Sequence, residues 1–495
     1  MAVQGIAEAR AALAEGRPAL IWERRLADTE TPVAAALKLM EPERGDFLLE
    51  SVEGGSVRGR HSLIGLAPDL VFRAHGDRAS INRRWPQDRD AFEPCAQPAL
   101  AALRDLVASC RMAVPDALPR ALACLVGYFG YETVGLVERL PRPPADPLGL
   151  PGMMFVRPSV LLIFDRLADV LFVVAPVWPG DDAEAALAKA AERIRATATR
   201  LDEATLPPAP RCAPATPVLE PQLAPGRYPA MVARAKEYIA AGDIFQVVLA
   251  QRFTAPFPLP PFELYRSLRR INPSPFLYHL DLPGFALTGS SPEILVRVRD
   301  GEVTIRPIAG TRPRGATPDE DAANRESLLA DPKERAEHLM LLDLGRNDVG
   351  RVTRGGSVRV TDSYTVEFYS HVMHIVSNVV GRLSPDHDAV DALFAGFPAG
   401  TVSGAPKVRA CQVIAELEDE VRGPYAGGVG YFSPDGAMDS CIVLRTAVVR
   451  NGTMHVQAGA GIVADSDPAY EQRECEAKAG ALLAAARDAI ARASA

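Results

Sequence analysis

The sequence predicts an α+β fold, a two-layer antiparallel β-sandwich with helices packed outside it. Runs of strand-like segments fill the N-terminal half, and strands and helices intermix after residue 225. The turn signals Pro434-Asp435-Gly436 and Asn451-Gly452 are typical of hairpins that join antiparallel neighbours. These observations favour an antiparallel layer over a regular alternation of parallel strands and helices.

Six apolar runs in the N-terminal half are typical of strands. They are PALIWERRLA, DFLLESVEG, HSLIGLAPDLVFRA, ALACLVGYFGY, SVLLIFD and DVLFVVAPVW. Helices are expected near residues 31–40, 90–111 and 181–201. The proline-rich segment that follows has no periodic pattern and is typical of a linker. We therefore expect an N-terminal α+β region at 1–205, a linker at 206–225 and a second domain at 226–495.

The second half is expected to open with a helix from Tyr228 to Gly242, followed by the β-branched strand IFQVVLAQRFT. A helix is expected from Ala405 to Leu417, and SCIVLRTAVVR should be one strand. The last helix should run from Pro468 to Ala493.

Between these elements, the stretch DPKERAEHLMLLDLGRNDVG (331–350) predicts a helix. Asp331 is a suitable N-cap and Pro332 a suitable first helical residue, while Gly345 and Asn347 indicate its end.

This helix would carry Glu334 and Glu337 on one face. Two carboxylates one turn apart suit Mg²⁺, which keeps some water and shares its charge with an anionic ligand. Zinc is disfavoured because HExxH is absent. A solvated helix face is the alternative that the pattern leaves open.

Composition sets broad limits on function. The chain has 495 residues, a hydrophobic content of 48% and a charged content of 23%, which are ordinary for a globular protein. A net charge of -8 disfavours general nucleic-acid binding. We expect no membrane span and no signal peptide. The seven scattered cysteines indicate reduced thiols and a cytoplasmic location.

Several other stretches could bind an anion. Glu471, Glu474 and Lys478 share a face of the last helix, although a surface helix with its own ion pairs would look the same. The run Gly459, Ala460 and Gly461 could form a nest of backbone N–H groups, or simply a tight turn.

The loops PIAGTRPRG and GFPAGTVSGAPK are rich in glycine and could hold an anion by backbone donors. Because GxxxxGK[ST] is broken in the second loop, ATP or GTP use is disfavoured. Arg445 is a lone charge in an apolar run, which is either a satisfied edge residue or a carboxylate clamp. His374 is by default a core histidine, and a proton-transfer role would need a substrate beside it.

Taken together, these stretches resemble the chorismate-binding enzymes. The motifs that carry the resemblance include GDIFQVVLAQRF, GSSPEIL, RPIAGTRPRG, FPAGTVSGAPK, GPYAGGVGYFS and GAGIVADSDP. The likeness covers about residues 228–483 almost continuously and makes 226–495 a chorismate-binding catalytic domain. Within the family the motifs are most similar to those of anthranilate synthase large subunits, component I, and the resemblance implies their fold.

The resemblance implies Mg²⁺-dependent amination of chorismate at C2 with ammonia, loss of the C4 hydroxyl and elimination of pyruvate to give anthranilate. It implies Glu337 and Glu474 as magnesium ligands, supported by Glu334 and Glu471. Glu293 would be the general acid and His374 would assist the loss of pyruvate, with Thr401 as a further catalytic residue. The implied substrate-binding residues are Gln246, Gly310, Thr311, Tyr425, Arg445, Gly459, Ala460, Gly461 and Lys478.

Two positions discriminate among relatives. Gln246 stands where the water-adding members of the family carry a lysine base, and a neutral amide cannot activate water in that way. Ala309 stands where aminodeoxychorismate synthases usually carry a nucleophilic lysine. Aminodeoxychorismate synthase, component I of the folate pathway, is therefore the alternative rather than the main interpretation.

The motif LLES resembles the tryptophan-sensing strand of the family. It implies feedback inhibition by L-tryptophan bound at Glu50 and Ser51 and closed by Pro275, Phe276 and Leu277. Phe276 and Leu277 depart from the familiar NPSPYM pattern, in which tyrosine and methionine occupy these two positions.

The sequence has no glutaminase nucleophile segment of the form Gly-x-Cys-x-Gly-x-Gln. We therefore expect a separate glutamine amidotransferase subunit, component II, in a heterotetramer of two large and two small subunits. A non-enzymatic amino-acid sensor and a metal-dependent hydrolase are the rival interpretations, and neither would make anthranilate from chorismate.

Overall fold

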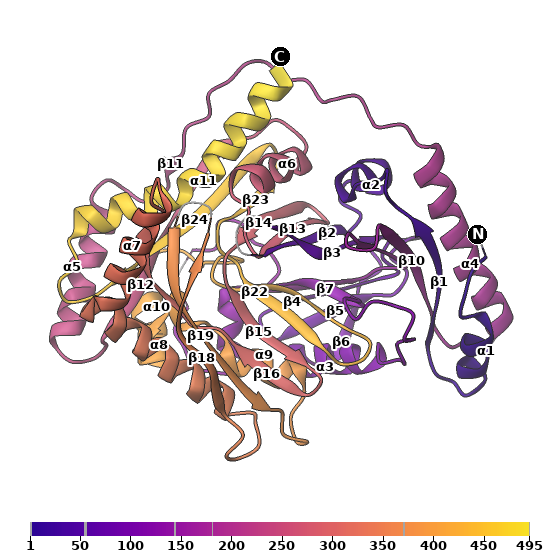
Figure 1. The fold of residues 1–495 in the computed structure, drawn as a ribbon, viewed down its shortest axis with the longest axis horizontal. Helices are drawn as coiled ribbons and strands as arrows, with labels where there is room; N and C mark the ends of the chain where they lie inside the picture. The colour runs from indigo at the N-terminus through magenta and orange to yellow at the C-terminus, as the bar shows by residue number, and fades with distance from the viewer. Residues whose placement is uncertain (1, 54–56, 143–144, 181, 370–371, 495) are drawn as a thin grey trace.

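The structure is a computed structural model that describes residues 2–53, 57–142, 145–180, 182–369 and 372–494. Two twelve-stranded sheets form its centre, and helices surround them (Figure 1). Pairing between neighbouring strands is antiparallel along both sheets. This confirms the predicted α+β fold with an antiparallel two-layer core.

The first sheet has the order β1-β10-β9-β3-β2-β13-β14-β23-β24-β12-β11, with β20 paired to β12. Its strands are β1 (Ala19–Leu26), β2 (Asp46–Glu53), β3 (Val57–Leu66), β9 (Val160–Asp165), β10 (Val170–Val177), β11 (Glu220–Pro221), β12 (Gln246–Pro256), β13 (Phe276–Leu282), β14 (Phe285–Ser291), β20 (Gly404–Ala405), β23 (Thr446–Arg450) and β24 (Thr453–Ile462).

The second sheet has the order β17-β19-β16-β15-β22-β21-β7-β8-β4-β5-β6, with β18 paired to β19. Its strands are β4 (Leu70–His75), β5 (Arg78–Asn82), β6 (Glu93–Pro98), β7 (Leu125–Phe129), β8 (Met153–Arg157), β15 (Ile294–Arg299), β16 (Glu302–Ile305), β17 (Ile308–Pro313), β18 (Arg359–Phe368), β19 (Val372–Arg382), β21 (Gly428–Phe432) and β22 (Met438–Ile442).

Each sheet combines strands from both halves of the chain. In the first sheet β2 pairs with β13, and in the second β7 pairs with β21. The segment between the halves crosses from α4 to the end of α11, where the Cys212 N–H donates to the Ala493 carbonyl at 3.2 Å (Figure 1). The domain boundaries at 205 and 226 stay a prediction.

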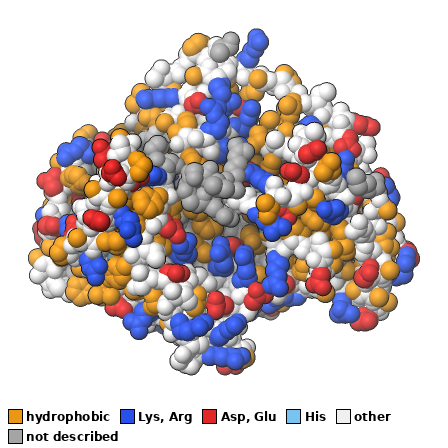
Figure 2. Space-filling model, in the orientation of Figure 1, with side chains coloured by type: hydrophobic (Ala, Val, Ile, Leu, Met, Phe, Trp, Pro, Cys, Tyr) orange, Lys and Arg blue, Asp and Glu red, His pale blue; other side chains and the backbone are white. Residues whose placement is uncertain are grey.

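The helices are α1 (Ile6–Ala14), α2 (Pro32–Leu39), α3 (Ala99–Ser109), α4 (Ala183–Glu203), α5 (Arg227–Ala240), α6 (Pro261–Ile271), α7 (Pro318–Ala330), α8 (Pro332–Gly350), α9 (Ala389–Gly396), α10 (Lys407–Leu417) and α11 (Pro468–Ser494), with 3-10 turns η1 (Tyr131–Leu136) and η2 (Gly400–Val402). Among the described residues, none of these helices combines the length and apolar character that a membrane crossing requires. Acidic and basic side chains are interspersed over the face shown in Figure 2.

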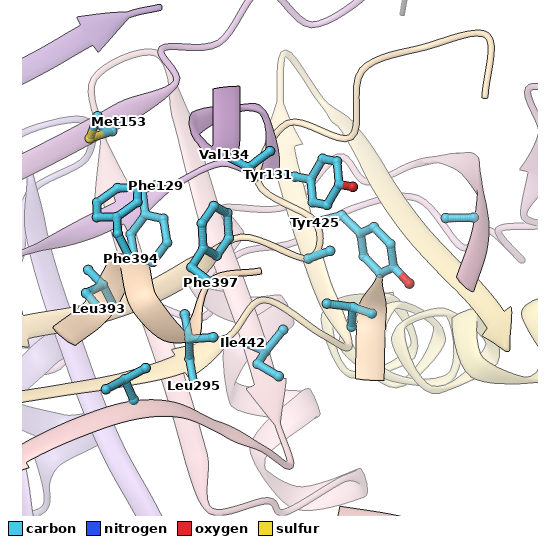
Figure 3. Close-up of a cluster of buried hydrophobic side chains, with 14 of the residues drawn as sticks. Phe129, Tyr131, Val134, Met153, Leu295, Leu393, Phe394, Phe397, Tyr425 and Ile442 are labelled. Atoms are coloured by element: carbon cyan, nitrogen blue, oxygen red, sulfur yellow. The ribbon is translucent and has the colours of Figure 1, made fainter. Parts of the chain in front are cut away.

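Burial of apolar side chains between the sheets and under the helices holds the layers together. Phe47, Ile163 and Phe172 of the first sheet meet Val126 and Val156 of the second in one buried cluster. The opposite face of the first sheet packs against α1, α2 and α4. A further cluster gathers Phe129, Phe394 and Phe397, with ring centroids 5.0 to 5.8 Å apart (Figure 3).

Three expectations about elements were wrong. Residues 93–98 form β6, so α3 begins only at Ala99. The runs HSLIGLAPDLVFRA and SCIVLRTAVVR each divide into two strands that lie in different sheets, which periodicity alone cannot reveal because both parts are equally apolar.

The expected end of the central helix was also wrong, because α8 continues to Gly350. Gly345 is buried, and a Cβ there would lie 3.1 Å from Cγ of Pro307. This glycine therefore permits a close approach and does not cap the helix. The predicted N-cap is confirmed, since the Asp331 carboxylate accepts from the N–H groups of Lys333 and Glu334.

Candidate active site at the junction of the two sheets

Two neighbouring segments pass from one sheet to the other and together form what we call the sheet junction, residues 291–294 and 443–445. The first connects β14 to β15, and the second connects β22 to β23. They run side by side, because the Ile442 N–H donates to the Glu293 carbonyl at 3.0 Å and the Ser290 N–H donates to the Arg445 carbonyl at 3.2 Å. The junction therefore places Glu293 and Arg445 in adjacent segments.

Glu293 carries a buried carboxyl group with one side-chain hydrogen bond among the described residues. The residue is 8% exposed, and the Thr401 hydroxyl on η2 donates to its Oε1 at 2.9 Å. Burial raises the pKa of Glu293 to about 8, although the hydrogen bond from Thr401 acts in the opposite direction. The carboxyl group is therefore largely protonated at neutral pH and can donate a proton.

Arg445 does not lie on a strand, so that expectation was wrong. Its backbone has a φ of 47°, in the left-handed region, where the chain turns from β22 into β23. Such a conformation is costly for a side chain other than glycine and is typical of functional positions. Among the described residues no side chain pairs with its guanidinium, whose pKa burial lowers. It is free to bind an anion.

His374 on β19 forms the next part of the site. Its Nδ1 lies 3.0 Å from the Gly310 carbonyl and 3.1 Å from the Thr311 hydroxyl, both on β17. A carbonyl only accepts, so Nδ1 carries the proton and Nε2 is left as the basic nitrogen. Burial lowers the pKa of His374, which favours this neutral form.

Tyr369 is a site residue that the sequence did not reveal. Its ring packs edge-on against His374 with centroids 5.4 Å apart, and the residue is 9% exposed. It follows the edge strand β18 and belongs to no glycine-rich or charged pattern, so no signal in the sequence distinguished it.

Glu337 on α8 faces the end of β12. Gln246 donates from Nε2 to its Oε1 at 3.3 Å. Burial raises the pKa of Glu337, and the negative charges of Glu334 and Glu474 add to this rise. Glu474 comes from α11, so carboxylates from two distant helices converge on one region.

The opposite wall is β24. Lys478 on α11 donates to the Gly459 carbonyl at 2.9 Å and pairs with Glu474 at 2.6 Å. A Cβ at Gly459 would lie 2.9 Å from the Tyr425 hydroxyl, and one at Gly461 would lie 2.7 Å from Nε2 of Gln246. These glycines therefore admit side chains close to the strand.

The expectation of a nest or tight turn at residues 459–461 was wrong. The three residues lie within the last part of β24, whose pairing with β12 continues to Ile462. Their peptide groups are thus presented by an ordered strand instead of a turn.

The acidic group does not form a complete metal cage. Glu334 is paired with Arg312 at 2.9 Å, and Glu471 is buried with its pKa raised by that burial. Over the described residues no three His, Cys, Asp or Glu side chains converge closely enough to hold a metal ion. Two mutually repelling carboxylates fit an ion that completes its shell with water and an anionic ligand, which is how Mg²⁺ usually binds.

A cavity of about 590 Å³ adjoins the sheet junction at Pro292 and Ile294. It is lined by Glu50, Ser51, Pro275, Phe276 and Leu277, the residues that the sequence grouped as an effector pocket. Although burial opposes it, Arg269, with help from Tyr265 and Arg166, holds the pKa of Glu50 below its usual range. Tyr369 and Ile294 also line this cavity, so it borders the segments that carry His374 and Glu293.

Comparisons with known proteins agree with this architecture. A family profile described as chorismate binding enzyme matches residues 46–484. Anthranilate synthase component 1 of Cereibacter sphaeroides is 53% identical over 96% of this chain and 95% of its own length. The family match and this relative confirm the interpretation of the motifs as those of anthranilate synthase component I, in preference to aminodeoxychorismate synthase.

Solved structures show the same fold. Anthranilate synthase component I from Streptococcus pneumoniae superposes with a TM-score of 0.77 at 35% identity, covering 93% of this chain and 99% of that one. The menaquinone-specific isochorismate synthase from Escherichia coli shares the fold, with a TM-score of 0.73 at 19% identity over 98% of this chain and 100% of that one. The matched profile includes the sheet junction and every strand of the two sheets except β1, and this chain belongs to the family of chorismate-binding enzymes.

Proposed function

We propose that this chain is an anthranilate synthase large subunit, which converts chorismate and ammonia to anthranilate, pyruvate and water. The observation that carries the proposal is the pair of adjacent segments at the sheet junction. One carries Glu293, whose pKa burial raises to about 8, and the other carries Arg445, whose guanidinium has no side-chain partner among the described residues. An acid that keeps its proton at neutral pH can assist a hydroxyl group to leave, and a nearby cation can hold a substrate carboxylate.

In this mechanism ammonia forms a bond to C2 while Glu293 gives its proton to the C4 hydroxyl, which departs as water. The neutral Nε2 of His374 is the proton-accepting nitrogen that assists the loss of pyruvate, after which the ring is aromatic. Thr401 keeps the Glu293 carboxyl group in place through its hydrogen bond. Gln246 cannot serve as a base, so water is not activated in place of ammonia.

Charged and polar groups around β24 would hold the two carboxylates of the substrate. We assign this role to Arg445, Lys478, Tyr425 and Thr311, with the peptide groups of residues 459–461. Lys478 already contacts the Gly459 carbonyl, and Thr311 contacts His374.

The carboxylates Glu337 and Glu474 would hold Mg²⁺. The ion would neutralise the ring carboxylate of the substrate when it is bound. The raised pKa of Glu337 supports this assignment, because a divalent cation relieves the repulsion that causes part of the rise. Glu471 would support the pair from the same face of α11, and Glu334 would act through Arg312.

We further propose that ammonia comes from a glutamine amidotransferase subunit, in a heterotetramer of two large and two small subunits. The name component 1 of the relatives supports a second component. L-tryptophan would bind in the 590 Å³ cavity at Glu50, Ser51 and residues 275–277 and would inhibit the enzyme.

The reaction itself can be tested with the purified chain. With chorismate, Mg²⁺ and an ammonium salt we expect anthranilate fluorescence and one pyruvate per anthranilate. Glutamine should not replace the ammonium salt until an amidotransferase subunit is added. Formation of aminodeoxychorismate or isochorismate, or glutamine use by the chain alone, would contradict the proposal.

Glu293→Gln should lower kcat by roughly 10²–10⁴-fold, the usual contribution of a general acid, with little change in KM for chorismate. In the protein without substitutions, kcat/KM calculated from the concentration of free ammonia should fall as the pH rises through about 8. The fall is expected because Glu293 then loses the proton that it must donate. Glu302→Gln on β16 is the control and should keep both properties. An unchanged alkaline limb in Glu293→Gln would rule out this acid.

Glu337→Gln should weaken Mg²⁺ binding by about tenfold or more, since even outer-shell partners change metal affinity by about 10- to 100-fold. Calorimetric titration with Mg²⁺ in the presence of chorismate and the absence of ammonia measures this directly. The control is Glu476→Gln, a substitution two residues beyond Glu474 on the same helix. This variant should bind Mg²⁺ with the affinity of the unsubstituted protein. Equal affinities for the two variants would refute the assigned ligand.

Ser51→Leu should fill part of the effector cavity and raise the tryptophan concentration for half inhibition by about tenfold or more, since 1.4 kcal/mol of lost binding equals tenfold. Activity without tryptophan should be unchanged, because Ser51 lies outside the junction. Inhibition curves for both proteins provide the measurement. Identical curves would place the effector elsewhere.

A further inference from the structure

A buried ion pair that has no part in the mechanism above lies behind the active site. Arg422 is 3% exposed and Glu418 is 5% exposed. Arg422 donates from Nη2 to Glu418 Oε1 at 2.5 Å and from Nε to Oε2 at 2.8 Å. The desolvation of two charges offsets much of the attraction in a buried pair, so its presence alone is weak evidence of a net gain in stability, and in some proteins such pairs specify one arrangement.

The pair completes the edge of β12. This strand pairs with β20 at Gln246–Val247 and with β11 at Phe253–Thr254. In the gap between them, Glu418 accepts from the Ala250 N–H at 2.9 Å and Arg422 donates to the Val248 carbonyl at 2.7 Å. Two side chains thus take the place of a neighbouring strand.

The same guanidinium also reaches the loop that carries Thr401. Its Nη1 donates to the Val402 carbonyl at 2.7 Å, one residue after Thr401. On the other edge of β12, Val248 and Ala250 are the register partners of Gly461 and Gly459. One side chain therefore connects the loop that carries Thr401 to β12, the strand that pairs with the proposed carboxylate-binding strand β24.

The surroundings fix the guanidinium in place. Its Cζ lies 4.6 Å from the ring centroid of Tyr131 and 5.6 Å from that of Tyr425. Figure 3 shows these two tyrosines side by side, at the edge of the phenylalanine cluster. Glu132 accepts from the backbone N–H groups of Arg422 and Gly423 at 2.7 and 3.0 Å. An arginine held at so many points behaves as part of the scaffold.

We propose that Arg422 and Glu418 are positioning residues that set the distance between the Thr401–Glu293 pair and the β12–β24 strands of the active site. The inference rests on the proposed function for its kinetic consequences, whereas its structural consequences are independent of that function. A lysine cannot replace the arginine, because one ammonium group cannot span Glu418, Val248 and Val402 in a planar fork.

Arg422→Lys is the direct test. Hydrogen–deuterium exchange should become faster at 246–250 and at 400–405 together. Under the assay conditions kcat should fall roughly 10- to 100-fold, the order expected for misplacement by about 1 Å. Glu418→Gln keeps an acceptor for the Ala250 N–H and should show the same changes to a smaller degree. This variant provides the test if Arg422→Lys does not fold.

Arg157→Lys is the matched control. Arg157 also pairs with a carboxylate at two points, Asp69 at 2.7 and 3.1 Å, and lies over an aromatic ring, Trp178 at 3.9 Å. It belongs to β8, away from the junction, so both exchange segments and kcat should stay unchanged. Equal effects in Arg157→Lys and Arg422→Lys would contradict the positioning role, because the Arg422–Glu418 pair would then act only as an ordinary stabilising contact.

The pH profile separates positioning from a general loss of stability. Besides Thr401, the titratable or charged groups around Glu293 in the described part of the chain are Tyr369 and, across a small cavity, Arg306 and Asp348. Thr401 lowers the pKa of Glu293, so its displacement should move the alkaline limb of kcat/KM to higher pH. In a Thr401→Ala background, Arg422→Lys should cause no further shift. A further shift of equal size would contradict action through Thr401.

The two proposals fail separately. If the unchanged chain makes no anthranilate, the proposed function is wrong, yet the exchange experiment still tests the positioning role. If anthranilate forms but the two segments keep their protection in Arg422→Lys, the positioning role alone is overturned.

Discussion

The structure depends on a single constraint: two antiparallel strand connections must cross together from one sheet to the other. The crossing leaves Glu293 only 8% exposed, and within the described part of the chain the Thr401 hydroxyl is the one polar side chain that hydrogen-bonds its carboxyl group. The same crossing forces Arg445 into a left-handed backbone conformation. Acid and cation are thus products of the topology, and a sheet that did not change layers could not present them together.

Electrostatics divides the site into regions of different character. Around Glu293 burial dominates, and the proton is retained. Burial also raises the pKa of Glu337, and the negative charges of Glu334 and Glu474 add to that rise, which suits the cation proposed for this region. His374 is kept neutral with its free nitrogen fixed by the Gly310 carbonyl. Three titratable groups whose environments move their pKa values in different directions can perform acid, base and binding roles at one pH.

Much of this arrangement could be predicted from residue patterns, because helix spacing and capping are local. Asp331 as N-cap and the shared face of Glu474 and Lys478 are examples. The crossings could not be predicted, since the apolar residues before and after Arg445 are alike and nothing in their periodicity marks the change of sheet between β22 and β23. Tyr369 and Arg422 were missed for a related reason: their partners lie far away in the chain, and neither residue belongs to a motif. The role of Gly345 was predicted wrongly because glycine is favoured both at the end of a helix and where a helix packs closely, here against Pro307.

The central claim is that folding at the sheet junction keeps the Glu293 carboxyl group protonated at neutral pH. The most direct measurement is its pKa, from carbon-13 NMR of the chain labelled at the glutamate side-chain carboxyl, with Glu293→Gln identifying the resonance. We expect titration near pH 8 in the free chain. A pKa near the ordinary value for glutamate, about 4.3, would contradict the account, because Glu293 would then be a carboxylate with no proton to donate.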